Sequence, residues 1–512
     1  MARNSLGRDV PERFHGRRYE PYHDPWSRQP HTDRGTRPLV RRNPRESKVL
    51  GSLREAIEKA GLASGMTIST HHHLRNGDVL LNRLVEEFEA MGLRDMTIAS
   101  SSVHPVHAAI IPAVQRGVVT RFETGVNGLI GEMVSRGELD VPVIVRSHGG
   151  RARSIIAEDV TIDAAFIAAP CCDETGNLNG VSGPSACGSL GYAYTDARYA
   201  RKVIAVTDHL VPYPAAPVSI SQSDVDWVVP IDSLGDPQKI VSTTTRVTRD
   251  PAGLLIARYA AQVIEASGLL EDGFAFQTGS GGISLAVADA VRRRMNEREI
   301  KGSFGCGGIT GTFVDMLEEG CFETLFDVQC FDIRAVQSIG RNPGHREISA
   351  DLYANPFNRG AVVDRLDCVI LGATEVDVDF NVNVNTESSG YLQHNTGGHA
   401  DTAAGAKLAI VVAPSIRGRL PIVRDRVTTV TTPGETIDVV VTERGIAVAD
   451  RHPDLKAELL RRRLPVKDIH QLHQEITAIT GVPRPIAFTD DVVALVEYRD
   501  GSIIDAIRRV RE

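Results

Sequence analysis

The sequence predicts an α/β fold built from two related halves, and three observations support this prediction. The chain has 512 residues, of which 42% are hydrophobic, as expected for a globular protein of more than one domain. Short apolar segments alternate with amphipathic segments of helical period, which is typical of a mostly parallel sheet covered by helices. A similar pattern also occurs twice along the chain. We therefore expect two duplicated α/β domains with a ligand site between them, and a β-rich C-terminal part.

The duplication is clearest in two segments rich in Asp and Asn. Their matching residues are separated by 204 positions in the sequence: Asp163 and Asp367, Asp173 and Asp377, Asn177 and Asn381, Asn179 and Asn383. A period of this length is far too long for a solenoid, so it indicates a duplicated domain.

We expect three segments along the chain. Residues 1–48 carry 12 Lys and Arg against 6 Asp and Glu, while the whole chain has a net charge of −8. Residues 1–47 are therefore interpreted as a basic flexible tail that docks on a partner subunit. Residues 48–248 form the predicted first domain and residues 249–512 the second.

The hydrophobic pattern predicts the elements in order. In the first half, helices are expected over 48–64 (ended by Gly61), 78–91 and 105–115, and strands over 66–69, 96–99, 141–145, 164–168 and 202–206. In the second half, helices are expected over 254–266, 285–296 and 313–319, and strands over 274–277, 302–306, 368–371 and 408–412. From about residue 416, β segments with turn signals surround one helix over 453–463.

Composition also excludes several classes of function. No run of about 18 apolar residues is present, so we expect no membrane span and no secretory signal. The seven cysteines have no C-x-x-C spacing, which argues against a zinc site and fits a reducing cytoplasm. No basic face with interleaved aromatic residues follows the N-terminal segment, so a nucleic-acid function is disfavoured.

The loops after the strands are expected to form the site, because ligands of parallel α/β sheets bind beyond the carboxyl ends of the strands. The first strand of the first half is followed by His71, His72, His73 and Arg75. Three adjacent histidines on extended backbone point in alternating directions, so no metal site is expected, and some of them could be structural. The equivalent strand of the second half is followed by Gly279, Gly281 and Gly282. One half thus offers charged side chains and the other offers backbone that a large cofactor can approach.

Two further groups of residues complete the candidate site. Arg75, Arg121 and Arg151 follow separate strands and suit a substrate with several carboxylates, although ordinary salt bridges are the alternative. Glycine-rich segments at 305–310 and 395–401 contain Gly307, Gly308, Gly397 and Gly398, which are candidate backbone donors. Neither G-x-x-x-x-G-K-[ST] nor G-x-G-x-x-G is present, so the fingerprints of nucleotide triphosphatases and dinucleotide-binding folds are missing.

Several motifs resemble the alpha chain of citrate lyase, a citrate CoA-transferase. The resemblance runs from about Leu50 to the C-terminus and rests on these segments: His71-His72, Arg75 and Asp78; Ser100–Ser102; Gly117–Arg121; Ser147–Arg151; Cys187–Tyr192; Gln277–Gly279; Gly307–Thr310; Phe380–Val384; and Gly397–His399. It implies a two-domain CoA-transferase fold and a homo-oligomer within a complex. The partners would be a lyase beta chain and an acyl-carrier gamma chain.

The resemblance also implies an activity. Such a chain exchanges citrate for acetate on acetyl-CoA, or on the phosphoribosyl-dephospho-CoA arm of the carrier, with no tightly bound cofactor. The expected site residues fall into three groups: His72 and the backbone of Gly307, Gly308, Gly397 and Gly398 for catalysis; Arg75, Arg121, Arg151, His399 and Asn383 for the acid; and Gly279, Gly281 and Gly282 for the CoA or carrier arm. Citramalate is an alternative acid, and a non-catalytic binder of sugar phosphates or nucleotides is the alternative function.

One departure from related CoA-transferases bears on the mechanism. Many of them use a Glu nucleophile, placed shortly before a helix that this sequence keeps as 314–320. Here Gly305-Cys306-Gly307-Gly308 stands in that place. The resemblance therefore implies direct attack by the substrate carboxylate through a mixed anhydride, with positioning and an oxyanion site supplied by the enzyme. Glu375 is the alternative nucleophile, although its place at the end of an apolar strand favours a structural role.

Overall fold

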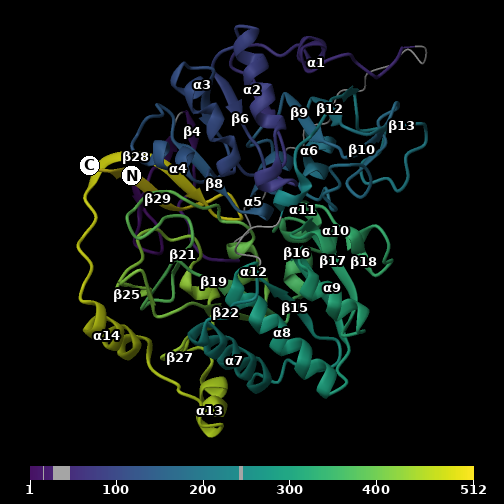
Figure 1. Cartoon of the computed structure of the whole chain (residues 1–512). Coiled ribbons are helices and arrows are strands. Elements are labelled where there is room, and N and C mark those ends of the chain that lie inside the picture. Colours follow the sequence, from purple (N-terminus) through teal and green to yellow (C-terminus); the bar gives the residue numbers. More distant parts are fainter. Residues whose placement is uncertain (15, 27–45, 241–245, 512) are drawn as a thin grey trace.

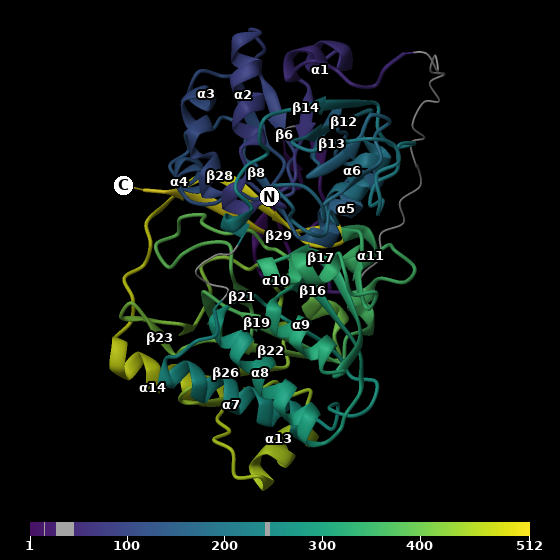
Figure 2. The ribbon, with the colours of Figure 1, turned by 45° about the vertical axis from the view of Figure 1, so that its right-hand side comes forward.

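A computed structural model of the chain describes residues 1–14, 16–26, 46–240 and 246–511. Two α/β halves lie one against the other, with the first half uppermost in Figure 1 and most of the second half below it; the yellow C-terminal hairpin lies beside the first half. Figure 2 shows the same division from a view turned by 45°. The predicted α/β class with mostly parallel sheets is confirmed.

The first half contains a six-stranded parallel sheet of order β14-β12-β9-β5-β6-β7. Its strands are β5 (Thr67–Ser69), β6 (Met96–Ile98), β7 (Val119–Phe122), β9 (Ala164–Ala168), β12 (Lys202–Thr207) and β14 (Trp227–Pro230). The helices of this half are α1 (Leu53–Ala60), α2 (Leu80–Ala90), α3 (Ile111–Gln115), α4 (Leu129–Ser135), α5 (His148–Ile156) and α6 (Ala193–Tyr199), with 3₁₀ turns at Arg75–Gly77, Pro105–Ile110 and Pro237–Ile240. The central strand β9 is buried at all five positions, as expected for a strand covered on both faces.

The second half contains an eight-stranded sheet of order β18-β17-β16-β15-β19-β22-β26-β27, parallel except for the last pair. Its strands are β15 (Ala275–Thr278), β16 (Gly302–Ile309), β17 (Phe322–Cys330), β18 (His345–Glu347), β19 (Cys368–Gly372), β22 (Leu408–Val412), β26 (Val439–Thr442) and β27 (Gly445–Val448). The helices are α7 (Pro251–Ala266), α8 (Gly282–Glu297), α9 (Gly311–Glu318), α10 (Ile333–Ile339), α11 (Ala350–Ala354), α12 (His399–Gly405), α13 (Pro453–Arg461) and α14 (Ile469–Thr480), with 3₁₀ turns at Val362–Arg365 and Gly434–Thr436.

The repeat seen in the sequence is also a repeat of structure. After β9, the chain forms β10 (Cys171–Asp173) and β11 (Leu178–Asn179), which join β13 (Leu210–Val211) in a small sheet. After β19, it forms β20 (Glu375–Asp377) and β21 (Val382–Asn383), which join β25 (Val423–Arg424) in the same way.

The side chains in the two small hairpins make matching bonds. Asp173 Oδ1 accepts from the amide of Asn177 at 3.1 Å, and Asp377 Oδ1 accepts from the amide of Asn381 at 2.9 Å. The spacing of Asp and Asn in the sequence therefore encodes one hairpin, used once in each half.

The chain termini lie together against the first half. The hairpin of β28 (Phe488–Glu497) and β29 (Ile503–Val510) pairs with β8 (Val143–Arg146), so the predicted strand at 141–145 lies outside the main parallel sheet. Short N-terminal strands β1 (Ala2–Arg3), β2 (Asp9–Val10), β3 (Arg13–Phe14) and β4 (Arg17–Arg18) precede Pro21, which bridges to Ile503. Figure 1 shows the yellow C-terminal hairpin beside the N-terminus.

This packing corrects the expectation of a tail that is flexible throughout. Val10 and Tyr22 are completely buried, and the amide of Tyr22 donates to the carbonyl of Ile503 at 3.1 Å. Residues 15 and 27–45, which also belong to the predicted tail, lie outside the described residues.

Two other expectations differ from the structure. The first helix begins at Leu53 rather than near residue 48, because the Ser52 side chain caps it by accepting from the amide of Glu55. Its predicted end at Gly61 is correct, and that glycine adopts a φ of 69°. The C-terminal part holds two helices, α13 and α14, where one was expected, together with the short strands β23 (Ile416–Arg417) and β24 (Leu420–Pro421).

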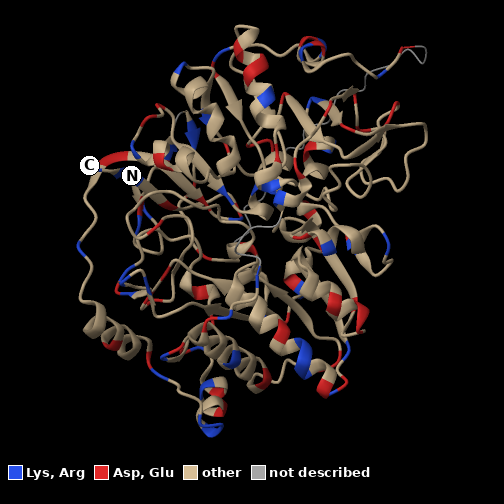
Figure 3. Cartoon of the chain, in the orientation of Figure 1, with Lys and Arg blue, Asp and Glu red and all other residues tan. Residues whose placement is uncertain are grey.

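The cysteines, the charged residues and the helices can each be compared with what the composition suggested. All seven cysteines are free and buried. Lysines and arginines are interspersed with acidic residues over both halves in Figure 3. Among the described helices, none has the length and apolar character needed to cross a membrane.

Candidate active site at the junction of the two halves

The segment after β5 carries the predicted histidines into the junction between the halves. His71, His72 and His73 are 2%, 5% and 0% exposed. The second half reaches this segment directly, because the Gln329 side-chain amide at the end of β17 donates to the His72 carbonyl at 2.8 Å. The loop after the first strand of one half is thus held by the other half, which makes the candidate site composite.

His72 is the centre of a cluster of rings. Its imidazole lies 4.6 Å from the ring of Tyr192, 5.4 Å from that of His104 and 5.9 Å from that of His148, measured between centroids. The Ser101 hydroxyl fixes the orientation of His72 through its Nδ1 at 2.7 Å. These rings come from four separate segments of the first half, so the cluster forms only when the half is folded.

The histidines of this cluster are neutral. Burial lowers the pKa of His72 well below its usual value, and the neighbouring His104 and His148 lower it further. Burial also lowers the pKa of His104 to about 3, with an added effect from Arg75. Burial likewise lowers the pKa of His148 to about 3, and Arg151 lowers it further. The permanent cation of this cluster is therefore a guanidinium and not an imidazolium.

Arg75 is that cation, and its surroundings suit an anionic ligand. Its guanidinium carbon lies 4.9 Å from the centre of the Phe331 ring, so a first-half arginine is stacked on a second-half aromatic. Its backbone has a φ of 51°, which is uncommon for a residue other than glycine. Its Nη1 is buried without a hydrogen-bond partner, as is Nε2 of His104. Buried polar atoms are normally paired, so these two unpartnered nitrogen atoms fit a ligand with acceptor oxygens.

The structure does not bring the other two predicted arginines to this point. Arg151 forms a bidentate pair with the buried carboxylate of Asp196, at 2.8 and 2.7 Å, and also donates to the carbonyl of Ala99 at 2.6 Å. It is therefore occupied by a structural ion pair. Arg121 lies on the edge strand β7 and is exposed. The ordinary-salt-bridge alternative thus describes Arg151, and Arg75 is left as the arginine that the site can use.

His399 and Asn383 were predicted to contact the acid, but the structure commits both to internal bonds. His399 is bonded through Nδ1 to Thr432 Oγ1 at 2.7 Å and through Nε2 to the carbonyl of Gly372 at 2.9 Å. Asn383 is completely buried, and its Oδ1 accepts from the amide of Thr386 at 3.0 Å. Asn179, its counterpart in the first half, accepts from Ser182 at the same spacing in sequence. His399 and Asn383 thus use their side chains for bonds within the second half.

The predicted glycines at 307 and 308 lie in a strand rather than in a loop. They lie near the end of β16, where the register with β17 shifts: Gly307 pairs with Asp327 and Gly308 with Gln329, so β17 has one extra residue here. Gly307 has a φ of 99°, and a Cβ added there would lie 2.7 Å from the side-chain amide nitrogen of Gln277. Only glycine allows this backbone conformation and this close approach together.

The other pair, Gly397 and Gly398, precedes α12 and faces the first half. The carbonyl of Gly397 accepts from the amide of His148 at 2.9 Å, so this loop touches the ring cluster through the backbone. A Cβ added at Gly398 would lie 2.6 Å from the Tyr353 hydroxyl, which itself accepts from Gln277 at 2.7 Å. The two glycine segments therefore meet on one side-chain pair, Gln277 and Tyr353.

The third glycine segment precedes α8. Gly281 is its N-cap, and no side chain caps this end. The amide of Gly279 donates to the carbonyl of Ile370 at 2.9 Å, so it is already used within the sheet. A Cβ on Gly282 would lie 2.7 Å from the carbonyl of Arg246. This segment is thus a close-packed helix start, and the prediction that it holds the CoA or carrier arm stays a prediction.

Glu375, the alternative nucleophile, is fully buried and fully engaged. Its Oε1 pairs with Arg424 at 2.9 Å, and its Oε2 accepts from the amide of Thr428 at 2.7 Å and from Asn383 at 3.0 Å. A carboxylate with so many partners is poorly placed to attack a thioester, which fits the structural role.

One group of described side chains has the composition of a metal site. Asp327, Cys330 and His345 are buried, and their ligand atoms lie within 4.8 Å of one another. They already bond to each other, because His345 and Cys330 both approach Asp327 Oδ2 at 2.9 Å. This group is separate from the three histidines considered in the sequence, and the absence of a metal stays a prediction.

Comparisons with known proteins decide the family. The family model described as citrate lyase, alpha subunit (CitF) matches residues 46–510. The chain belongs to this family. It is 49% identical to the citrate lyase alpha chain of Klebsiella pneumoniae over 91% of this chain and 92% of that one. It is 48% identical to the citrate lyase alpha chain of Escherichia coli K12 over 91% and 92%. The expectation from the sequence motifs is confirmed.

Solved structures agree with the family. A crystal structure of the putative alpha subunit of citrate lyase from Streptococcus mutans, in complex with citrate, superposes with a TM-score of 0.96, at 46% identity over 99% of this chain and 100% of that one. The alpha subunit of a malonate decarboxylase from Acinetobacter baumannii has a TM-score of 0.62 at 14% identity, over 84% of this chain and 93% of that one, and shows the shared fold alone. The present chain is thus an enzyme subunit of citrate lyase, which sets aside the alternative of a non-catalytic regulator.

Several residues of the cluster were missing from the predicted site. His104 and His148 follow β6 and β8, so strand-end position was the signal for them. Tyr192 lies just before α6 and ends the segment Cys187–Tyr192, one of those on which the resemblance rests. Gln329 and Phe331 come from the end of β17 in the other half, and no pattern in the sequence pairs them with His72 and Arg75.

Proposed function

We propose that this alpha subunit moves a thioester from acetyl to citrate, acting on acetyl-CoA or on the acetylated carrier arm. The observation that carries the proposal is the buried guanidinium of Arg75, which has a free Nη1 and lies among neutral imidazoles. An always-charged donor in a desolvated site suits a carboxylate, and neutral rings suit the remaining oxygens of a polycarboxylate. The relative from Streptococcus mutans that was crystallised with citrate supports citrate as the acid.

The proposed chemistry is a direct exchange. A carboxylate oxygen of citrate attacks the acetyl carbonyl carbon, the carbon–sulfur bond breaks, and the thiolate leaves. The product of this step is a mixed anhydride of citrate and acetate. The thiolate then attacks the citryl carbonyl, the anhydride C–O bond breaks, and acetate leaves with the bridging oxygen. No proton or electron is consumed overall, so the enzyme has to supply alignment and stabilisation of developing oxyanions.

Direct attack is favoured over an enzyme nucleophile. The segment that corresponds to the one with the Glu in related enzymes lies near the end of β16, where Gly307 and Gly308 carry no carboxylate. Glu375 is held by Arg424, Thr428 and Asn383. In this proposal the backbone of the two glycine segments at 307–308 and 397–398 lies where an oxyanion develops.

The proposed role of His72 is orientation of citrate. Its Nδ1 is engaged with Ser101, which leaves Nε2 as the nitrogen that can face a ligand. With a pKa well below the usual range, the ring is a neutral hydrogen-bond partner and not a cation. Within the complex, the product citryl thioester would pass to a lyase beta chain while a gamma chain carries the thioester arm. Citramalate remains the alternative acid, since it shares the hydroxy-acid group.

The test is a direct assay of the purified chain. Acetyl-CoA and citrate should yield citryl-CoA and free acetate, measured by liquid chromatography with mass detection. Citramalate in place of citrate tests the alternative acid in the same assay. Absence of any CoA ester of either acid, with acetyl-CoA unchanged, would refute the proposed activity.

A further inference from the structure

Asp401 joins three parts of the molecule at one buried point. It lies on α12, and its side chain is completely buried. One carboxylate oxygen, Oδ1, accepts from the hydroxyl of Ser147 at 2.8 Å, and Oδ2 accepts from the amide of Gly149 at 2.9 Å. Arg499, in the turn between β28 and β29, places its Nε 3.7 Å from Oδ1. A single carboxylate of the second half thus binds the start of a first-half helix and the C-terminal hairpin.

The carboxylate completes the cap of helix α5. Ser147 is the N-cap residue, and its hydroxyl accepts from the amide of Gly150 at 3.0 Å while donating to Asp401. A negative charge at a helix N-terminus is favourable, and here it comes from the opposite half. The fit leaves no space for a side chain, because a Cβ on Gly149 would lie 2.0 Å from the carbonyl of Ala354 and 2.9 Å from Asp401 Oδ1.

His148 lies between the two residues that bond to Asp401. Its neighbours Ser147 and Gly149 both bind Asp401, and its own amide donates to the carbonyl of Gly397 at 2.9 Å. Its ring lies 4.5 Å from that of Tyr192 and 5.9 Å from that of His72. The bonds of Asp401 therefore hold the backbone on both sides of His148. This backbone carries the His148 ring into the cluster around His72 and also contacts the loop of Gly397.

We propose that Asp401 is a positioning residue that holds His148 and the Gly397–Gly398 loop in register across the two halves. Without its carboxylate, the acid and the thioester would still bind, but on two surfaces that are no longer aligned for attack. This inference rests on the proposed transfer reaction and adds a residue that touches neither substrate.

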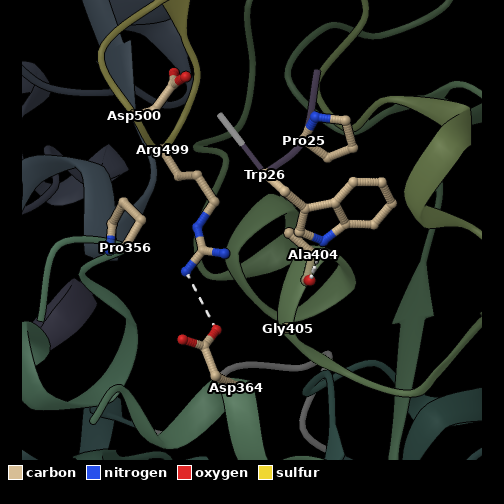
Figure 4. A pocket seen from close by; sticks show the side chains of 8 residues that line it. All are labelled: Pro25, Trp26, Pro356, Asp364, Ala404, Gly405, Arg499 and Asp500. Atoms are coloured by element: carbon tan, nitrogen blue, oxygen red, sulfur yellow. Dashed lines mark hydrogen bonds and ion pairs between the residues drawn. The ribbon is translucent and has the colours of Figure 1, made fainter. Parts of the chain in front are cut away.

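The chain offers a matched control in Asp364. Figure 4 shows Arg499 pointing toward Asp364 in a pocket of about 340 Å³ that Trp26 also lines. Asp364 Oδ1 lies 3.8 Å from Nη2 of Arg499, almost the same separation as the 3.7 Å between Asp401 Oδ1 and Nε of Arg499. Asp364 is 45% exposed in its side chain, and its carboxylate faces Arg499. Asp364→Asn therefore removes a charge from Arg499 and leaves the helix cap intact.

The experiment compares Asp401→Asn, Asp364→Asn and Ser147→Ala with the full-length wild-type chain. Citrate Kd and stoichiometry come from calorimetry, so each rate can be referred to the fraction of folded sites. We expect Asp401→Asn to lower kcat at least tenfold per citrate-binding site while the KM values for citrate and acetyl-CoA change by less than about twofold, an alignment effect of about 1.4 kcal/mol or more. Ser147→Ala should show a smaller loss, and Asp364→Asn none.

Hydrogen exchange gives a second readout that does not depend on activity. In Asp401→Asn, amides at the start of α5 should exchange faster, whereas those of the main sheets should not change. An unchanged kcat despite faster exchange at α5 would overturn the proposal, as would an equal loss in Asp364→Asn. If Asp401→Asn fails to fold, an unchanged kcat in Ser147→Ala would overturn it. A wild-type chain without transfer activity would refute the proposed function, while the exchange data would still report whether Asp401 holds α5.

Discussion

The guanidinium of Arg75, from the first half, lies 4.9 Å from the centre of the Phe331 ring, from the second half. This contact places the cation of the candidate citrate site at the junction of the halves. A planar guanidinium can stack on the ring while its free Nη1 donates to a carboxylate oxygen; an ammonium lacks the planar group, and an apolar side chain can do neither. Removal of Arg75 should therefore affect the binding of citrate and not that of acetyl-CoA.

Arg75→Ala should raise the citrate KM by tenfold or more and leave the acetyl-CoA KM nearly unchanged. Loss of a charge-assisted hydrogen bond costs on the order of 1.5–3 kcal/mol. Steady-state kinetics with each substrate varied in turn measure the effect. Arg121→Ala is the control, because Arg121 is exposed on an edge strand and should have no effect. A higher KM for acetyl-CoA with an unchanged KM for citrate would contradict the prediction, because the first half would then bind the thioester and not the acid.

Gly398→Val should abolish turnover for every acid tested. Even a Cβ at this position would lie 2.6 Å from the Tyr353 hydroxyl, so the loop beside the ring cluster would have to move. Gly360→Ala is the matched control, since a Cβ there meets nothing within 4 Å. Circular dichroism should confirm that both variants are folded, and normal turnover in folded Gly398→Val would exclude the loop from the reaction.

The buried histidines should make the chain lose stability in mild acid. His104 and His148 have pKa values lowered to about 3, mainly by burial, against about 6.5 in an unfolded chain. As the pH falls from about 6 to 4, the unfolded state takes up these protons and the folded state does not. The free energy of unfolding should therefore fall by about 1.4 kcal/mol per pH unit for each ring.

A single variant isolates this effect. His104→Gln should reduce the pH dependence of the unfolding free energy by about one proton, measured from urea denaturation between pH 4 and 7. The wild-type chain measured in parallel supplies the reference slope, which includes the carboxylates common to both. Identical slopes for the two proteins would show that His104 is protonated in the folded state.

Chelation should leave the transfer rate unchanged, because the proposed exchange uses no metal. We expect the same initial rate of citryl-CoA formation with and without EDTA after dialysis. A rate that falls with EDTA and returns with added zinc would direct attention to Asp327, Cys330 and His345, the described group with suitable ligand atoms.

The parts predictable from the sequence were those set by local patterns. The hairpin of Asp173 and Asn177 recurs at Asp377 and Asn381, because each Asp binds the backbone and side chain of its own Asn, four residues on. Strand and helix order was predictable for the same reason, as each element carries its own period. The loop of histidines and Arg75, which its position at a strand end singled out, lies at the junction of the halves.

The remaining parts depend on partners far away in the chain. Arg151 looked like a carboxylate-binding arginine, and it does bind a carboxylate, but that of Asp196 in the same half. His399 uses both ring nitrogens within the second half, which its position after a glycine pair does not reveal. The pairing of β28 with β8 joins residues about 350 positions apart, and edge pairing of that kind has no local signature.

The most direct test of the central claim follows oxygen through a single turnover. Enzyme in excess over acetyl-CoA is mixed with citrate labelled with ¹⁸O in its carboxylates, and the released acetate is analysed by mass spectrometry. Attack by citrate itself predicts acetate that carries one ¹⁸O, because the bridging oxygen of the mixed anhydride leaves with it. Unlabelled acetate in the first turnover would mean that an enzyme carboxylate such as Glu375 had attacked, which would contradict direct transfer.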